Sequence, residues 1–154
     1  MEEYLQDIIS NLLHALKVDF DHVQIDIKQD FDGDDYYYCN IITKDASILI
    51  GKKGRNIQAI QHLVKLILFK RTNNDTKISI DVDSYRERQE ETVRVIAERH
   101  VQKVLENGQS QALPPMTPYF RRVVHMHLTE NFKDIETQSR GYGERRHIVI
   151  SKKS

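Results

Sequence analysis

The chain has 154 residues, of which 39% are hydrophobic and 30% are charged. This length and composition suit one domain or two small ones with a folded core, and they exclude global disorder. No apolar run approaches the about 20 residues of a membrane-spanning helix, and the acidic start Met1–Glu3 does not resemble a signal peptide. The single cysteine, Cys39, excludes an internal disulfide and a cysteine-rich zinc site. We therefore expect a cytoplasmic protein that inserts into no membrane and carries no cofactor.

The net charge of zero conceals two segregated regions. Residues 19–35 contain seven aspartates and one lysine, whereas residues 44–71 contain seven lysines or arginines and one aspartate. Screening acts over only about 8–10 Å, so these regions can produce strong local fields. The alternative is a pair of ordinary solvated faces, and charge alone does not separate the two interpretations.

Hydrophobic periodicity predicts an α+β unit in the first half of the chain. Its elements are a helix over residues 3–17, a hairpin of strands over 23–27 and 36–43, a short helix over 46–50, a long helix over 55–70 and a strand over 77–82. The long helix has one apolar stripe made of Ile57, Ile60, Leu63, Val64, Ile67 and Leu68. Leu66 and Phe69 lie on its opposite side, where they pack on the first helix or contact a second protein. The unit is expected to end near Asp83.

A second α+β unit is predicted from residue 84 onward. Ser84 and Glu87 have the spacing of a capping box for a helix over residues 85–106. An extended connector over 113–116 precedes Thr117 and Pro118, which suit the N-cap and first position of a helix through about Thr129. Two strands follow, over residues 133–139 and 147–151. We therefore expect two domains, 1–83 and 84–154.

The turn between the two predicted helices of the first unit combines glycine with positive charge. Gly51 and Gly54 allow a tight turn and a close approach of another chain, and Lys52, Lys53 and Arg55 add three cations. Backbone N–H groups at the start of a helix are unpaired and favour an anion. The turn therefore suits contact with a phosphodiester backbone.

Residues 50–61, Ile-Gly-Lys-Lys-Gly-Arg-Asn-Ile-Gln-Ala-Ile-Gln, resemble the signature of a KH domain in the bacterial type II order. The resemblance extends over about residues 4–83. It implies that the loop clamps about four nucleotides of single-stranded backbone, with the bases in a groove beside the paired helices and the third strand. Tyr36, Tyr37 and Tyr38 offer stacking surfaces, but alternation along the strand buries at least one of its faces.

In the second unit, Arg121 and His125 are four residues apart on a predicted helix and so share one face. A helical wheel places them at the border of the apolar stripe, with His125 accessible. His127 faces the core on the same wheel, together with Phe120, Val123, Val124 and Leu128.

Arg121-x-x-x-His125, with the Tyr85–Arg88 and Leu113–Tyr119 segments, resembles the R-three-H domain over about residues 84–151. Such domains bind single-stranded nucleic acid, which implies phosphate contacts from Arg122, Arg145, Arg146 and Lys152 here. A type II KH domain followed by a small α+β R-three-H domain is similar to the Jag (KhpB) family of bacteria.

The family resemblance implies an RNA chaperone or post-transcriptional regulator that binds single-stranded RNA, with single-stranded DNA as the second candidate ligand. It also implies pairing with a small KH-only protein or with a second copy. Longer members carry a further N-terminal domain and a charged linker that are not found in this sequence, so functions tied to that part are not expected.

The sequence also bears on two other classes of function. An enzyme is not expected, because the seven histidines are scattered, His125 and His127 point about 200° apart on a helix, and no common catalytic motif occurs. The alternative function is a protein-interaction adaptor that dimerises through its KH domain, with RNA binding secondary.

Overall fold

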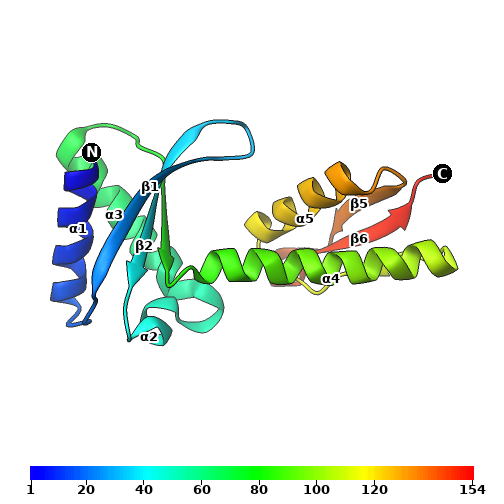
Figure 1. Cartoon of the computed structure of the whole chain (residues 1–154), viewed down its shortest axis with the longest axis horizontal. Helices are drawn as coiled ribbons and strands as arrows, with labels where there is room; N and C mark the ends of the chain where they lie inside the picture. Colours follow the sequence, from blue (N-terminus) through cyan, green and yellow to red (C-terminus); the bar gives the residue numbers. More distant parts are fainter. The chain divides into compact units, whose positions relative to one another are not determined.

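The computed structural model describes residues 1–154, and the chain divides into two compact units, Met1–Arg86 and Glu87–Ser154. Each unit is a mixed α+β structure with its own three-stranded sheet (Figure 1). The predicted fold class is therefore confirmed.

The first unit follows the predicted order of elements. These are α1 (Glu2–Ala15), β1 (His22–Gln29), β2 (Asp35–Ile42), α2 (Ala46–Ile50), a 3₁₀ turn (Lys52–Gly54), α3 (Arg55–Thr72) and β3 (Ile78–Val82). Strand β2 lies in the middle of the sheet, antiparallel to β1 and parallel to β3. Cys39 pairs with Ile25 on one side and with Ile80 on the other. A parallel pair needs a long crossover, which α2 and α3 supply.

Helices α1 and α3 contact each other, α1 contacts β1, and α3 contacts β3 (Figure 1). The core between them is aliphatic, with Leu5, Ile9, Leu13, Ile41, Ile57, Val64, Leu68, Ile80 and Val82 nearly inaccessible to water. The expected burial of Leu63 in the apolar stripe of the long helix was wrong, because its side chain is 44% exposed. Ile27, in β1, alternates in phase with Val23 and Ile25 but is 57% exposed. Both residues have the correct period, but each lies beyond the surface that the opposing elements cover.

The first turn of α4 (Tyr85–Asn107) is capped by an aspartate of β3. The buried carboxylate of Asp81 accepts hydrogen bonds from the Arg86 N–H at 3.1 and 3.2 Å and from the Tyr38 hydroxyl at 2.8 Å. Ser84, the predicted N-cap, has a left-handed φ of 55° and instead shares hydrogen bonds with the Asn40 side chain. An N-cap residue normally has extended dihedrals, so Ser84 does not have the conformation of one.

The second unit contains most of α4, followed by β4 (Gln111–Ala112), α5 (Pro118–Asn131), β5 (Ile135–Arg140), a 3₁₀ turn (Gly143–Arg145) and β6 (His147–Lys152). Strand β6 lies between β4 and β5, antiparallel to both. Ala97, Val101 and Val104 of α4 pack with Val124 and Leu128 of α5 and with Ile148 and Ile150 of β6. The two-residue strand β4 was not predicted, because it is too short to show a period.

Candidate nucleic-acid interface

The Gly51–Gly54 loop has a backbone that depends on its glycines. Gly51 has φ 69° and ψ −177°, a combination that is almost restricted to glycine, and Gly54 is left-handed with φ 74°. Lys53 is also left-handed, with φ 54° and ψ 32°. Three positive φ angles within four residues produce a sharp turn directly before α3. Lys52 and Lys53 are exposed at its tip.

Asn56, in the first turn of α3, connects the two sides of this loop. Its Nδ2 donates a hydrogen bond to the Ile48 carbonyl of α2 at 2.7 Å. A Cβ atom added to Gly51 would lie 2.5 Å from Asn56 Cγ. Gly51 is therefore required twice, for its dihedral angles and for the space that the Asn56 side chain occupies.

Two backbone N–H groups of this loop are hydrogen-bonded within the loop, whereas unpaired N–H groups were expected. Gly54 donates its N–H to the Gly51 carbonyl at 3.3 Å, and Arg55 donates its N–H to the Lys52 carbonyl. These bonds close the 3₁₀ turn, so two of the N–H groups expected to be available for an anion are already used. Positive charge at the loop therefore comes from the exposed side chains of Lys52, Lys53 and Arg55.

In the second unit, side chains of α5 meet hydroxyl groups of β5. Arg121 Nη1 donates to Ser139 Oγ at 2.7 Å, and Arg146 Nε donates to the same oxygen at 2.9 Å. One turn further along α5, His125 Nδ1 is hydrogen-bonded to Thr137 Oγ1. The i, i+4 spacing on the helix thus matches the i, i+2 spacing on the strand.

These contacts border a surface pocket of about 530 Å³. Its lining includes Pro118, Arg121, Arg122, His125, Thr137, Ser139, Arg146 and Ile148. Four of the predicted site residues therefore gather around one hollow, although Arg146 is distant from the others in the sequence. Arg145 is exposed beside Arg146 but does not line the pocket, and Lys152 lies at the end of β6.

Arg121 has one polar atom that is not satisfied within the chain. Its Nε is buried and has no hydrogen-bond partner, whereas Nη1 binds Ser139. A buried donor without an acceptor is unfavourable by about 1–3 kcal/mol. A rotation of this guanidinium toward an anion in the pocket would exchange the Nη1 bond to Ser139 for bonds to the anion and would break no bond at Nε.

His127 lies at the edge of the core rather than within it. Its Nε2 is 2.7 Å from Glu98 Oε1 of α4, and its side chain is 20% exposed. The helical wheel gave the correct side of α5, because Val124 and Leu128 on the same side are buried. It could not show that an acidic residue of another helix meets the imidazole.

Sequence reasoning missed two residues that line this pocket and one exposed aromatic residue in the turn that precedes Arg145. Thr137 and Ser139 are two apart on one face of β5, a signal that becomes meaningful only once α5 is placed over that strand. Tyr142 lies in the turn between β5 and β6 and is 92% exposed, between Gly141 and Gly143. A tyrosine between two glycines, just before Arg145 and Arg146, could have been recognised as a candidate for base stacking.

The structure contains no group of three histidine, cysteine, aspartate or glutamate side chains that could hold a metal ion. None of its helices combines the length and the apolar character needed to span a membrane.

Comparison with known proteins identifies two domain types. Residues 6–82 match the family model of the KhpA/KhpB KH domain, and residues 91–152 match that of the R-three-H domain. The chain is 31% identical over 153 residues to the RNA-binding protein KhpB of Clostridium symbiosum, with 98% of this chain and 64% of that protein covered.

Two further relatives carry the same name. KhpB of Lactiplantibacillus plantarum is 33% identical over 84% of this chain and 39% of its own length. KhpB of Bacillus subtilis is 33% identical over 74% of this chain and 55% of its own length. The chain thus spans less than two thirds of each of these relatives.

Proposed function

This chain belongs to the KhpB (Jag) family, and on that premise we propose that it binds single-stranded RNA at two basic surfaces. The loop surface consists of Gly51, Lys52, Lys53, Gly54 and Arg55. The helix surface consists of Arg121, Arg122, His125, Arg145 and Arg146. One surface belongs to each domain, for which we propose the limits 1–83 and 84–154.

The pocket beside α5 is the observation that carries this proposal. Three arginines and a histidine surround two hydroxyl groups, and no acidic side chain lines the hollow. Arg121 and Arg146 both donate to Ser139 Oγ, a neutral acceptor. A phosphate has more acceptor sites and a negative charge, so it can accept bidentate hydrogen bonds from a guanidinium group and attract its positive charge, which a single hydroxyl oxygen cannot do.

The geometry of the loop surface favours a single-stranded nucleic acid over a duplex as the ligand. Lys52 and Lys53 lie on a sharply turned backbone that suits close approach to one sugar-phosphate chain. Bases of a duplex are stacked inward and cannot enter a groove beside such a loop. Single-stranded DNA is the second candidate ligand, because phosphate contacts do not distinguish the two sugars.

The test uses the Arg121→Ala/His125→Ala variant of the whole chain and fluorescently labelled single-stranded RNA. We expect clearly weaker binding by a chain that still folds, with only a small fall in melting temperature, because each side chain contributes a hydrogen bond to β5 but neither belongs to the apolar core. Arg99→Ala/His100→Ala on α4 is the matched control and should bind as the parent does. Equal binding by the parent and the Arg121/His125 variant would remove the helix surface from the proposal.

At the cellular level we propose a cytoplasmic RNA chaperone or post-transcriptional regulator. Two separate single-strand contacts allow one protein to hold an unpaired segment open for a second strand. Annealing of two complementary RNAs should therefore be faster with the protein than without it. An unchanged annealing rate would argue against the chaperone role but leave RNA binding intact.

A specific observation favours the adaptor as a second candidate function. Leu63, Leu66 and Phe69 on α3 are 44%, 53% and 51% exposed, and exposed apolar groups of this kind mark contact surfaces. A small KH-only protein or a second copy would cover them. Leu66→Asp/Phe69→Asp should then abolish dimers in sedimentation experiments without changing RNA affinity. A parent chain that stays monomeric alone and beside a KH-only partner would exclude this function.

A further inference from the structure

Strand β1 is an unpaired edge of the first sheet and borders a pocket of its own. It has eight residues and pairs with β2 alone. The N–H and C=O groups on its outer side are therefore available to a further strand. A pocket of about 670 Å³ lies between this strand and α1. A groove between an edge strand and a helix is the geometry in which domains bind an extended peptide as an added strand.

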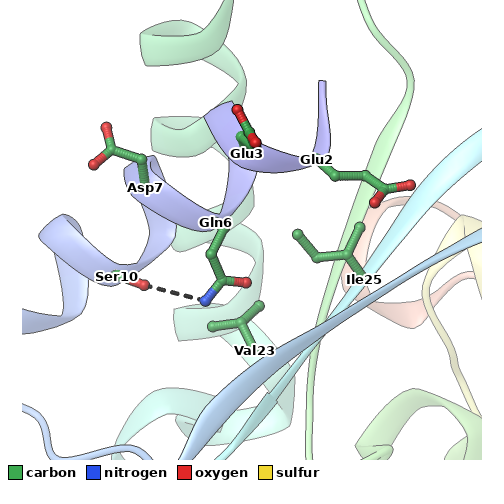
Figure 2. Close-up of a pocket in the computed structure, with 7 residues that line it drawn as sticks. All are labelled: Glu2, Glu3, Gln6, Asp7, Ser10, Val23 and Ile25. Carbon is green, nitrogen blue, oxygen red and sulfur yellow. Dashed lines mark hydrogen bonds between the residues drawn. The ribbon is translucent and has the colours of Figure 1, made fainter.

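The floor of this groove is apolar and incompletely covered. Val23 and Ile25 form it from β1, and Gln6 and Ser10 line it from α1 (Figure 2). The exposed fraction of the apolar side chains on this face of the strand rises from 7% at Val23 to 57% at Ile27. An added strand would cover the aliphatic side chains that α1 leaves exposed, which favours association in the same way as core burial does.

The rim of the groove is acidic. Glu2 and Glu3 are exposed on α1, and Figure 2 shows Glu2 directed toward the side where Ile25 lies. Asp7 also lines the groove, but its carboxylate is paired with Arg71 at 2.6 Å. Glu2 and Glu3 thus border the groove as exposed acidic groups, in addition to the neutralised Asp7.

The cations near this edge do not cancel its charge. Arg71 is bound to Asp7, and Lys28 Nζ lies 3.5 Å from the ring centroid of Tyr38. The segment 19–35 holds seven aspartates and this one lysine. Two of the aspartates, Asp30 and Asp34, are paired with Lys77, and the segment remains acidic. RNA is therefore repelled from β1, and so is a second copy that pairs through its own β1, which would bring a surface of the same sign to the same place.

We propose that β1 and α1 form a docking groove for an extended, lysine- or arginine-rich segment of another protein, which adds to the sheet beside β1. Its backbone pairs with the outer edge of β1. Every second side chain of the added strand faces α1, and the lysines or arginines at these positions extend their methylene stems over Ile25 and Ile27 and end at Glu2 and Glu3. The groove is thus a protein-binding surface distinct from both RNA surfaces.

The test uses the whole chain and a labelled peptide, as long as β1, in which lysine alternates with valine. We expect saturable binding that weakens with salt, and no binding of the matched peptide with glutamate in place of lysine. Two further versions of the lysine peptide carry backbone N-methyl groups on alternate residues. One version is methylated at the odd-numbered residues and the other at the even-numbered residues. One of them should lose binding, because its methyl groups replace the N–H donors that face β1.

Substitutions in the chain show where on its surface the peptide binds. Glu2→Lys/Glu3→Lys should weaken binding by about tenfold or more, since it reverses two charges at the rim. Asp75→Lys/Glu106→Lys makes the same change in charge elsewhere and should have no effect. In NMR titrations, the amide signals of β1 and α1 should shift with the peptide and stay unchanged with single-stranded RNA.

Three results would overturn the proposal. The first is equal binding of the lysine and glutamate peptides. The second is a shift of the β1 signals with RNA, which would make the edge a nucleic-acid surface. The third is concentration-dependent self-association that Ile25→Lys abolishes, which would make the occupant a second copy.

Discussion

Asn56 Nδ2 donates a hydrogen bond to the Ile48 carbonyl at 2.7 Å and so joins α3 to α2 across the glycine-lysine loop. This side chain is exposed, and it fills the space in which a Cβ atom of residue 51 would lie. It fixes the backbone on both sides of Lys52 and Lys53 but does not belong to the proposed loop surface. Asn56 is therefore a positioning residue for the loop surface.

Asn56→Ala should weaken RNA binding while lowering the free energy of unfolding by only about 1 kcal/mol, the net value of a typical hydrogen bond. Asn56→Asp should not restore binding, because a carboxylate cannot donate to the Ile48 carbonyl. Gln58→Ala, on an exposed part of the same helix, is the control. Unchanged affinity in Asn56→Ala would show that the loop is positioned by its glycines alone.

Lys52→Asp/Lys53→Asp should abolish most RNA binding without changing the fold. Two charges are reversed at the loop tip. Log affinity falls linearly with log salt, and each lost phosphate contact makes this fall less steep, by about 0.7 in slope for single strands. Fluorescence anisotropy at several salt concentrations measures that slope. Lys17→Asp/Lys70→Asp changes the net charge equally and should retain binding. A parent-like slope in the first variant would contradict the loop surface.

The extent to which the sequence predicted this site depends on the distance between its parts. Lys52 and Lys53, or Arg121 and His125, lie within one local pattern, and their exposure on a turn or helix face follows from periodicity. Ser139 receives hydrogen bonds from Arg121 and Arg146, which lie on different elements, and no local pattern encodes that meeting. The Asp81 cap of α4 was missed because Ser84 has the preferred composition of a cap but a left-handed backbone.

Tyr142→Ala should weaken binding of single-stranded RNA by about 1–3 kcal/mol, the usual value of one base stacked on an aromatic ring. The side chain is 92% exposed, so its loss should leave the melting temperature unchanged. Tyr142→Phe keeps the ring and should bind as the parent does. If the phenylalanine variant lost as much affinity as the alanine variant, the hydroxyl rather than stacking would account for the contact.

Cys39 should make the protein less stable at alkaline pH. Burial raises the pKa of its thiol from an ordinary value of 9.0 to about 12. Above the lower value the unfolded chain loses this proton while the folded chain keeps it, so the free energy of unfolding falls as pH rises from about 9 toward 12. Urea unfolding at several pH values measures the fall. Cys39→Ala should be less stable at neutral pH and should show a shallower decline, and an identical decline in both would contradict this assignment.

The last prediction separates the two histidines of α5. His127 is bonded to Glu98 of α4 and is 20% exposed, whereas His125 is exposed and bonded to Thr137 of β5. His127→Ala should therefore lower thermal stability with little effect on RNA binding, and His125→Ala should do the reverse. The interaction itself is measured by a double-mutant cycle of His127→Ala and Glu98→Gln, for which we expect a coupling of about 1 kcal/mol or less because Glu98 is partly exposed to water. Additive effects in the cycle would show that His127 stabilises the unit through packing alone. Loss of RNA affinity in His127→Ala at an unchanged melting temperature would instead move this residue into the RNA-binding face, and the assignment of sides on α5 would be wrong.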